Sequence, residues 1–211
     1  MVQSLSPISS RPSVGRASQL VQDVLPVDPG IVDIFPQRGL RKGSVLRLRG
    51  SYGSGLYSFA VQSLVAASQH GAWVALFNVD DLGYGFLLRS GVDLERTLII
   101  HDDQHPSRTL ATLLESFAIV VTPPNLSLAQ MARLSARARE RSSIIISVER
   151  VARSGSAGVP RWEGGVDLTV YLRSASWAMD LESGITSVNR GEVVVTVEHH
   201  GVGRTVVASA S

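Results

Sequence analysis

The sequence has no cysteine, which excludes disulfide bonds, thiolate catalysis and zinc sites built on cysteine. Aromatic residues make up only 6% of the chain, so a core must be mainly aliphatic. No apolar run approaches the roughly 18 residues that a membrane span requires, and the N-terminus lacks the apolar segment of a secretory signal. We therefore expect a cytoplasmic protein without a membrane segment.

Lysine is nearly absent as well, since Lys42 is accompanied by nineteen arginines. The net charge is only +2, yet the isoelectric point is about 9.4, because few groups titrate between neutral pH and the arginine range. A high isoelectric point often accompanies nucleic-acid binding, but here it overstates the basicity. Evidence for DNA contact must come from local clusters of arginine.

Hydrophobic patterning predicts alternating strands and helices in the middle of the chain. The expected strands are 44–50, 72–79, 96–102, 118–122 and 142–148, and the expected helices are 17–25, 56–70, 84–91, 106–117 and 127–141. Residues 149–165 read as a mobile loop, and 166–173, 192–200 and 204–209 as further strands, the last two forming a hairpin. This order predicts an α/β fold with a doubly wound, mainly parallel sheet and an antiparallel C-terminal strand extension. We expect residues 1–15 to be a disordered tail and 16–211 to form one domain.

The stretch RGSYGSGLYSFAVQ, residues 49–62, has the rhythm of a phosphate-binding loop between a strand and a helix. The working pattern is G-x-x-x-x-G-K-[ST], in which the lysine reaches the phosphates and the hydroxyl holds magnesium. Here Leu56 stands at the lysine position and Tyr57 at the hydroxyl position. The degenerate loop therefore comprises Gly50, Gly53, Ser54, Gly55, Leu56 and Tyr57.

A second residue that nucleotide hydrolysis requires is also missing. The strand 118–122 ends in Thr122 followed by two prolines, where a magnesium-supporting aspartate is needed. Asp80, after strand 72–79, remains as a relic of a water-activating acid. We therefore expect no catalytic residues, no cofactor and no NTPase activity, with the loop kept as a connector whose helix N-terminus favours at most a weakly bound anion.

Three segments, GLRKGSVLRLRG, HGAWVALFNVDD and SGVDLERTLII, resemble the RecA recombinase core in their order around the glycine loop. The likeness runs from about Gly30 to Val148 and more loosely through the C-terminal strands. Within that superfamily the chain is most similar to ImuA-type proteins and their short actinobacterial form, ImuA-prime. This resemblance implies a RecA-like accessory factor of damage-induced, error-prone translesion synthesis. The implied partners are a Y-family polymerase homologue (ImuB-like) and an error-prone replicative polymerase; DNA is a separate candidate partner.

Two arginine-rich regions are candidate contact surfaces. Arg133, Arg137 and Arg141 recur every four residues on the helix 127–141, as either a solvated face or a patch for DNA phosphates or an acidic partner. The loop 149–165 carries three further arginines and a tryptophan, which either stacks on a base or partner or packs against the sheet. These residues are Arg150, Arg153, Arg161 and Trp162.

The stretch HDDQH, residues 101–105, gathers metal-capable side chains, but adjacent loop residues cannot all face one ion, so we expect no metal. The leading hypothesis is a non-catalytic scaffold for translesion synthesis that acts through protein contacts. The alternatives are an ATP-binding RecA-like recombinase or NTPase with an unorthodox site, a bare DNA-binding module, and a SulA-like inhibitor of cell division.

Overall fold

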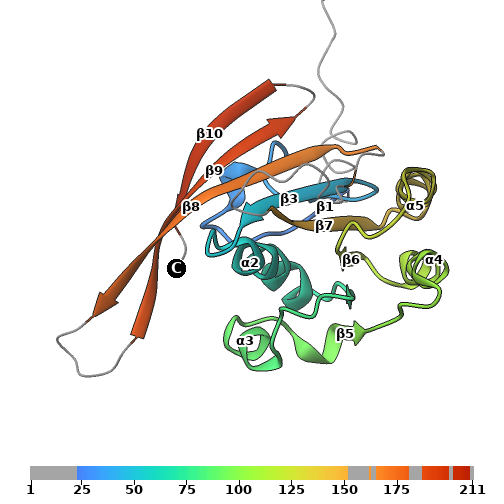
Figure 1. Cartoon of the computed structure of the whole chain (residues 1–211), viewed down its shortest axis with the longest axis horizontal. Helices are drawn as coiled ribbons and strands as arrows, with labels where there is room; N and C mark the ends of the chain where they lie inside the picture. Colours follow the sequence, from blue (N-terminus) through green and yellow to red (C-terminus); the bar gives the residue numbers. More distant parts are fainter. Residues whose placement is uncertain (1–22, 152–161, 163–164, 181–186, 200–201, 210–211) are drawn as a thin grey trace, which may run out of the picture.

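The computed structural model describes residues 23–151, 162, 165–180, 187–199 and 202–209 (Figure 1). The predicted disordered tail, residues 1–15, lies outside this part of the chain.

One eight-stranded sheet forms the centre of the molecule, with strand order β10-β9-β8-β3-β7-β6-β4-β5 (Figure 1). All neighbouring strands from β8 to β5 pair in parallel, whereas β9 is antiparallel to both β8 and β10. The predicted α/β fold class, a RecA-like core with an antiparallel C-terminal extension, is therefore confirmed. The strands are β3 (Val45–Ser51), β4 (Val74–Phe77), β5 (Thr97–Ile100), β6 (Ile119–Thr122), β7 (Ile144–Val151), β8 (Leu168–Asp180), β9 (Ser187–His199) and β10 (Val202–Ser209).

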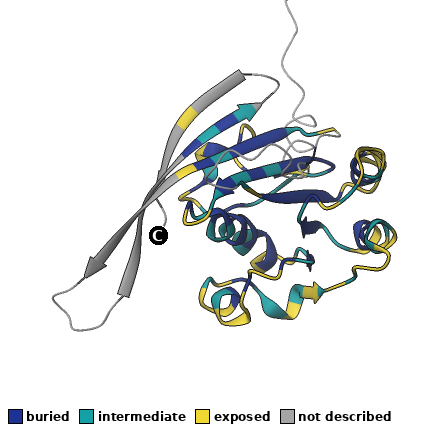
Figure 2. Ribbon diagram, viewed as in Figure 1, coloured by how far each residue is buried: buried dark blue, intermediate teal, exposed yellow. Residues whose placement is uncertain are grey.

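Helices cover both faces of the sheet, as a doubly wound fold requires. Helix α2 (Leu56–Gln69) packs its apolar side on one face, together with Leu87 of the short α3 (Tyr84–Arg89). Helices α4 (Pro106–Ser116) and α5 (Leu128–Arg141) cover the other face. The burial colours show the strands β3, β6 and β7 enclosed between these layers, while the outer faces of α4 and α5 and part of β5 are exposed (Figure 2).

Helix α5 begins where the sequence predicts, because Ser127 caps it. The Ser127 hydroxyl accepts from the Gln130 amide nitrogen at 3.4 Å, and the Gln130 side chain accepts from the Ser127 amide nitrogen at 3.0 Å. This reciprocal capping box satisfies two amide groups that the first helical turn leaves without partners.

The N-terminal part of the described chain differs from the sequence-based prediction. Residues 17–22 of the expected helix lie outside the description, and Val24–Leu25 form a strand, β1, paired antiparallel with β2 (Leu40–Arg41). A Cβ on Gly39 would stand 2.5 Å from the Leu25 carbonyl oxygen, so only glycine permits this close pairing. The prediction of a helix over 17–25 was therefore wrong at its end. Val24–Leu25 pair with β2, a strand about fifteen residues later in the sequence.

The predicted start of the mobile loop 149–165 is also too early in the sequence. Strand β7 continues to Val151 because its pairing with β3 extends from Val45↔Ile145 to Ser51↔Val151. The short helices η1 (Val32–Ile34) and η2 (Leu94–Arg96) complete the described elements.

Candidate functional site

The glycine loop joins the end of β3 to the first turn of α2, at the edge where parallel strands present their carboxyl ends. Gly53 and Gly55 both adopt left-handed backbone angles, with φ of 79° and 80°. A Cβ on Gly50 would collide with the Ser54 hydroxyl. The loop thus keeps the backbone of a phosphate-binding turn, and each of these glycines is required by its geometry.

Leu56 and Tyr57, which stand at the lysine and hydroxyl positions of the pattern, make contacts within the domain. Leu56 is only 4% exposed and packs into the core beneath the loop. The Tyr57 hydroxyl donates to a carboxylate oxygen of Asp81 at 2.7 Å and accepts from Arg150 at 3.0 Å. Arg150 also forms an ion pair with Asp81, and its guanidinium carbon lies 5.5 Å from the centre of the Tyr57 ring.

We call these three residues, Tyr57, Asp81 and Arg150, the latch. They come from α2, the segment after β4, and β7, and so connect three elements over the glycine loop. They line a hollow of about 310 Å³ together with Ser51, Tyr52, Gly53, Gly55, Leu56 and Ser58. Arg150 gives the hollow the positive charge that the missing lysine would have supplied, but Asp81 neutralises that charge. A phosphate entering here would have to replace the Asp81 carboxylate on Arg150.

The two adjacent acids after β4, Asp80 and Asp81, have different surroundings. Asp80 is not among the residues lining the hollow, and its carboxylate pairs with His101 Nδ1 at 2.9 Å. Asp81, the next residue, faces the loop. Sequence spacing cannot choose between these adjacent carboxylates, because the turn after β4 no longer follows the alternation of a strand.

The end of β6 carries no acid, as the sequence indicates. Thr122 is buried, and its hydroxyl donates to the carbonyl oxygen of Pro123 at 3.1 Å. Thr122 and the two prolines that follow it therefore offer no carboxylate to a magnesium ion at the end of this strand.

The HDDQH segment has a structural arrangement centred on Asp102. This carboxylate accepts from the Thr109 hydroxyl and from the amide nitrogens of Gln104 and His105, both at 2.9 Å. The Thr109 contact, followed by that of the His105 amide, lowers the pKa of Asp102 below its ordinary value. In the described part of the chain no cluster of three or more His, Cys, Asp or Glu side chains could hold a metal ion.

The three arginines predicted to form a stripe on α5 have different surroundings. Arg137 forms an ion pair with Glu115 of α4, whereas Arg133 and Arg141 are exposed. Arg150 belongs to the latch, and Arg153 and Arg161 lie outside the described residues.

Trp162 is fully buried, so its predicted role as an exposed stacking residue is wrong and the alternative, packing within the domain, is correct. Its indole nitrogen donates to the Ser135 hydroxyl at 3.0 Å, and its amide nitrogen donates to Glu149 at 2.5 Å. Glu149 is itself buried and pairs with Arg49 Nε at 3.0 Å. The composition of the loop did not predict this burial. The Trp162 side chain lies between α5 and β7, which contact it through Ser135 and Glu149, residues distant from it in the sequence.

The sheet order and the glycine loop define a RecA-like α/β domain whose phosphate loop lacks its lysine, its hydroxyl and its magnesium-supporting acid. The chain matches the family model of the MT3502 N-terminal domain over residues 33–153. This match covers more than half of the 211 residues, and the protein belongs to that family. A search of curated proteins finds no match. The matched segment includes the whole latch, and none of the described helices is long and apolar enough to cross a membrane.

Proposed function

We propose that this protein is a non-catalytic RecA-like scaffold that acts through protein contacts and does not hydrolyse nucleotide. The observation that carries the proposal is the latch: an internal Tyr57–Asp81–Arg150 network occupies the position where a nucleotide-binding domain needs free positive charge. Phosphoryl transfer depends almost entirely on positioning and charge neutralisation, and the described residues around this loop supply neither.

The β5 edge of the sheet supports a role in protein contacts. Strand β5 is the last strand on one side, and Leu98 and Ile99 are 39% and 41% exposed. An edge strand with exposed apolar side chains pairs readily with a strand of another chain. Trp73, 47% exposed, lies near the start of β5, because the guanidinium carbon of Arg96 is 5.6 Å from the centre of its ring.

The biological setting of the proposal comes from the resemblance to ImuA-type proteins. It assigns the scaffold to damage-induced, error-prone translesion synthesis, in the cytoplasm and at the nucleoid when recruited. The partners would be a Y-family polymerase homologue and an error-prone replicative polymerase, with DNA contacted through the exposed arginines of α5.

Titration of the pure protein with ATP and magnesium tests the absence of a nucleotide site. A ligand at 100 times its dissociation constant stabilises a protein by about 2.7 kcal/mol, which a melting curve resolves. We expect no magnesium-dependent shift. A clear magnesium-dependent shift would instead support the alternative, an NTPase with an unorthodox site, which the amide groups at the N-terminus of α2 favour.

Pull-down of the purified polymerase homologue tests the scaffold role directly. We expect capture by the wild-type protein and weaker capture by Ile99→Lys, which places a charge on the β5 edge. The matched control is Leu128→Lys, at a 57% exposed position on α5 far from that edge in the strand order. Equal capture by both variants would exclude the β5 edge as the contact surface, and no capture by the wild type would contradict the scaffold proposal.

A further inference from the structure

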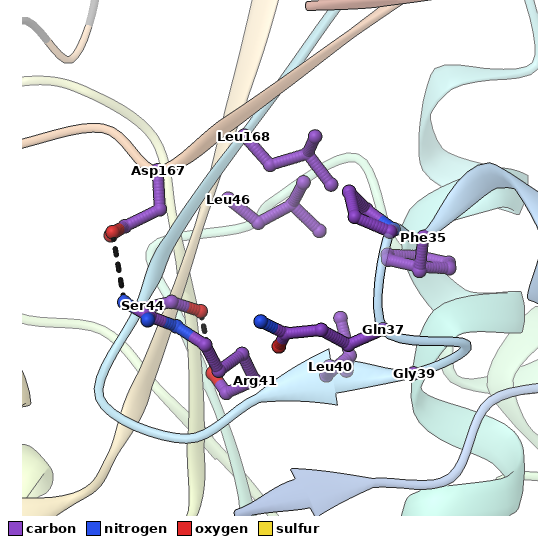
Figure 3. A pocket seen from close by; sticks show the side chains of 10 residues that line it. Phe35, Gln37, Gly39, Leu40, Arg41, Ser44, Leu46, Asp167 and Leu168 are labelled. Atoms are coloured by element: carbon purple, nitrogen blue, oxygen red, sulfur yellow. Dashed lines mark hydrogen bonds and ion pairs between the residues drawn. The ribbon is translucent and has the colours of Figure 1, made fainter. Parts of the chain in front are cut away.

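A second hollow lies at the opposite end of β3 from the glycine loop. It is formed where residues 35–44 lie beside the first residues of β3 and β8 (Figure 3). We call it the anchor pocket; its lining residues are Phe35, Pro36, Gln37, Gly39, Leu40, Arg41, Ser44, Leu46, Asp167 and Leu168.

The interior of the anchor pocket is apolar. Leu46 and Leu168 are register partners on adjacent parallel strands, and their side chains point into the pocket side by side (Figure 3). Phe35 and Leu40 lie across from them, and these four side chains are at most 8% exposed. Such walls favour an apolar occupant over a polar one.

The size of the pocket matches one side chain. Its volume is about 140 Å³, close to the roughly 150 Å³ of an apolar cavity that binds benzene. The pocket therefore accommodates a single aromatic ring or a branched aliphatic group, and it is too small for a cofactor or a nucleotide.

Hydrogen bonds hold the polar side of the pocket in place. The Asp167 carboxylate accepts from the Val45 amide nitrogen at 2.9 Å and from Arg41 at 3.1 Å. The Ser44 hydroxyl donates to the Arg41 carbonyl oxygen at 2.5 Å. Because these contacts join β2, β3 and the start of β8, an occupant would enter a preformed site and would not have to order it.

Two arginines adjoin Asp167 at the rim of the pocket: Arg41 lines the pocket, whereas Arg139 lies beside it and does not line it, and the three groups together carry a net charge of +1. Arg41 and Arg139 both contact Asp167, at 3.1 and 3.3 Å, so two guanidinium groups share one carboxylate. Their side chains are 48% and 43% exposed and remain accessible to a further anionic group. Charge complementarity at such a rim selects acidic partners.

We propose that the anchor pocket binds an acidic segment of a partner protein, with one aromatic side chain inserted between Leu46 and Leu168. Aromatic side chains inserted into well-packed pockets are among the few residues that carry most of the binding energy in protein interfaces. The site lies away from the latch, so occupation of one does not obstruct the other.

Four acetylated, amidated tetrapeptides separate the contributions of the anchor and the charge: Asp-Asp-Phe-Asp, Asp-Asp-Leu-Asp, Asp-Asp-Ala-Asp and Lys-Lys-Phe-Lys. Binding is followed by the NMR shifts of the Leu46 and Leu168 methyl groups. We expect the acidic phenylalanine peptide to bind with a dissociation constant on the order of 1 mM. Replacing its ring by alanine should weaken binding by at least about tenfold, and the basic peptide should bind more weakly than the acidic one. Tightest binding by the leucine peptide would overturn the assignment of an aromatic anchor.

Two variants and two controls connect this binding to the pocket. Leu168→Phe fills the hollow and should abolish the methyl shifts, whereas Leu88→Phe, a matched change at an exposed position of α3, should leave them unchanged. Arg41→Gln should weaken the acidic peptide severalfold, whereas Arg108→Gln on α4 should not. If Leu168→Phe fails to fold, Arg41→Gln still tests the site.

The proposal is overturned if the Leu46 and Leu168 methyls do not respond at about ten times the expected dissociation constant, or if the alanine peptide binds as well as the phenylalanine peptide. It rests on the scaffold proposal only for the identity of the partner. The peptides report on the pocket and the ATP titration reports on the loop, so failure of one is distinguishable from failure of the other.

Discussion

At the scale of single residues, Tyr57 decides the character of the glycine loop. A serine or threonine there would direct a short hydroxyl to a metal ion. The longer tyrosine instead reaches Asp81 and Arg150 and connects them. One side chain therefore both removes a magnesium ligand and joins α2 to β7.

We predict that Tyr57→Phe lowers the free energy of unfolding by about 0.5–1.5 kcal/mol. The variant keeps the ring but loses a hydrogen bond to each partner, and both partners are partly exposed, which limits the loss. Urea unfolding measures it. Tyr52→Phe is the matched control, because Tyr52 is 84% exposed in the same loop; equal losses in the two variants would contradict the latch.

Asp102 gives a second prediction at this scale. Its folded-state pKa lies below the ordinary value, so its ionised form stabilises the fold at pH values above the unfolded-state pKa. That contribution is lost as the pH falls through the folded-state pKa, below the ordinary 3.8. Thr109→Val removes the largest cause and should raise the pKa of Asp102 toward its ordinary value.

An NMR titration of the Asp102 carboxyl carbon measures this change. Thr112→Val is the control, because the Thr112 hydroxyl donates to the Arg108 carbonyl oxygen and not to Asp102. An unchanged Asp102 pKa in Thr109→Val would show that the Thr109 hydroxyl does not hold the carboxylate in solution.

At the scale of elements, β7 and α5 together form a buried contact that local sequence does not reveal. The strand presents Glu149 inward, and the helix presents Ser135, and both bind Trp162. An acid inside a sheet is costly unless it is paired, and here Arg49 on the neighbouring strand β3 supplies the charge. A segment that composition describes as a surface loop thus contributes the largest fully buried side chain of the described chain.

We predict that Trp162→Ala destabilises the protein by about 3–5 kcal/mol, as truncation of a fully buried aromatic residue does. Thermal or urea unfolding measures the loss. Trp73→Ala, at a 47% exposed position, should cost clearly less. Similar small effects at both positions would mean that Trp162 is accessible, and the DNA-stacking role rejected above would have to be reconsidered.

At the scale of the whole molecule, the charge distribution limits what the protein can do with DNA. A net charge of +2 cannot hold a nucleic acid by itself, and several arginines are already paired, including Arg137 with Glu115 and Arg150 with Asp81. Arg133 and Arg141 remain as exposed groups on α5 that face solvent. Direct DNA contact, where it occurs, should therefore be weak and concentrated on this helix.

We predict that the double variant Arg133→Gln, Arg141→Gln reduces the salt dependence of single-stranded DNA binding. Each phosphate contact contributes about 0.7 to the slope of log affinity against log salt, so the slope should fall by about 1.4. Fluorescence anisotropy over a salt series measures it. Arg137→Gln should change the slope less, because its charge is already paired; an unaltered slope in the double variant would show that the α5 arginines do not touch phosphates.

Much of this molecule was predictable from local sequence. The apolar runs at 74–77, 119–122 and 144–148 specify buried parallel strands, and Ser127 with Gln130 specifies the start of α5. These features depend on residues a few positions apart, and their order along the chain indicates a doubly wound sheet. The prediction failed at Val24–Leu25, and the sequence could not decide between the two roles of Trp162 or between the adjacent acids Asp80 and Asp81. In these cases the partner lies far along the chain or a turn interrupts the periodicity.

The sequence by itself determined the α/β order and the absence of charge at Leu56 and Thr122, where the phosphate-loop pattern needs a lysine and an acid, since no fold gives these side chains a charge. Only the tertiary structure decided that Asp81 faces the loop and forms an ion pair with Arg150, 69 residues further along the chain. The tertiary structure also decided that Trp162 is buried and that an apolar pocket lies between β2 and β8. The reason is physical. Side-chain chemistry and backbone periodicity are local properties, whereas charge pairing, burial and cavities exist only once distant segments are brought into contact.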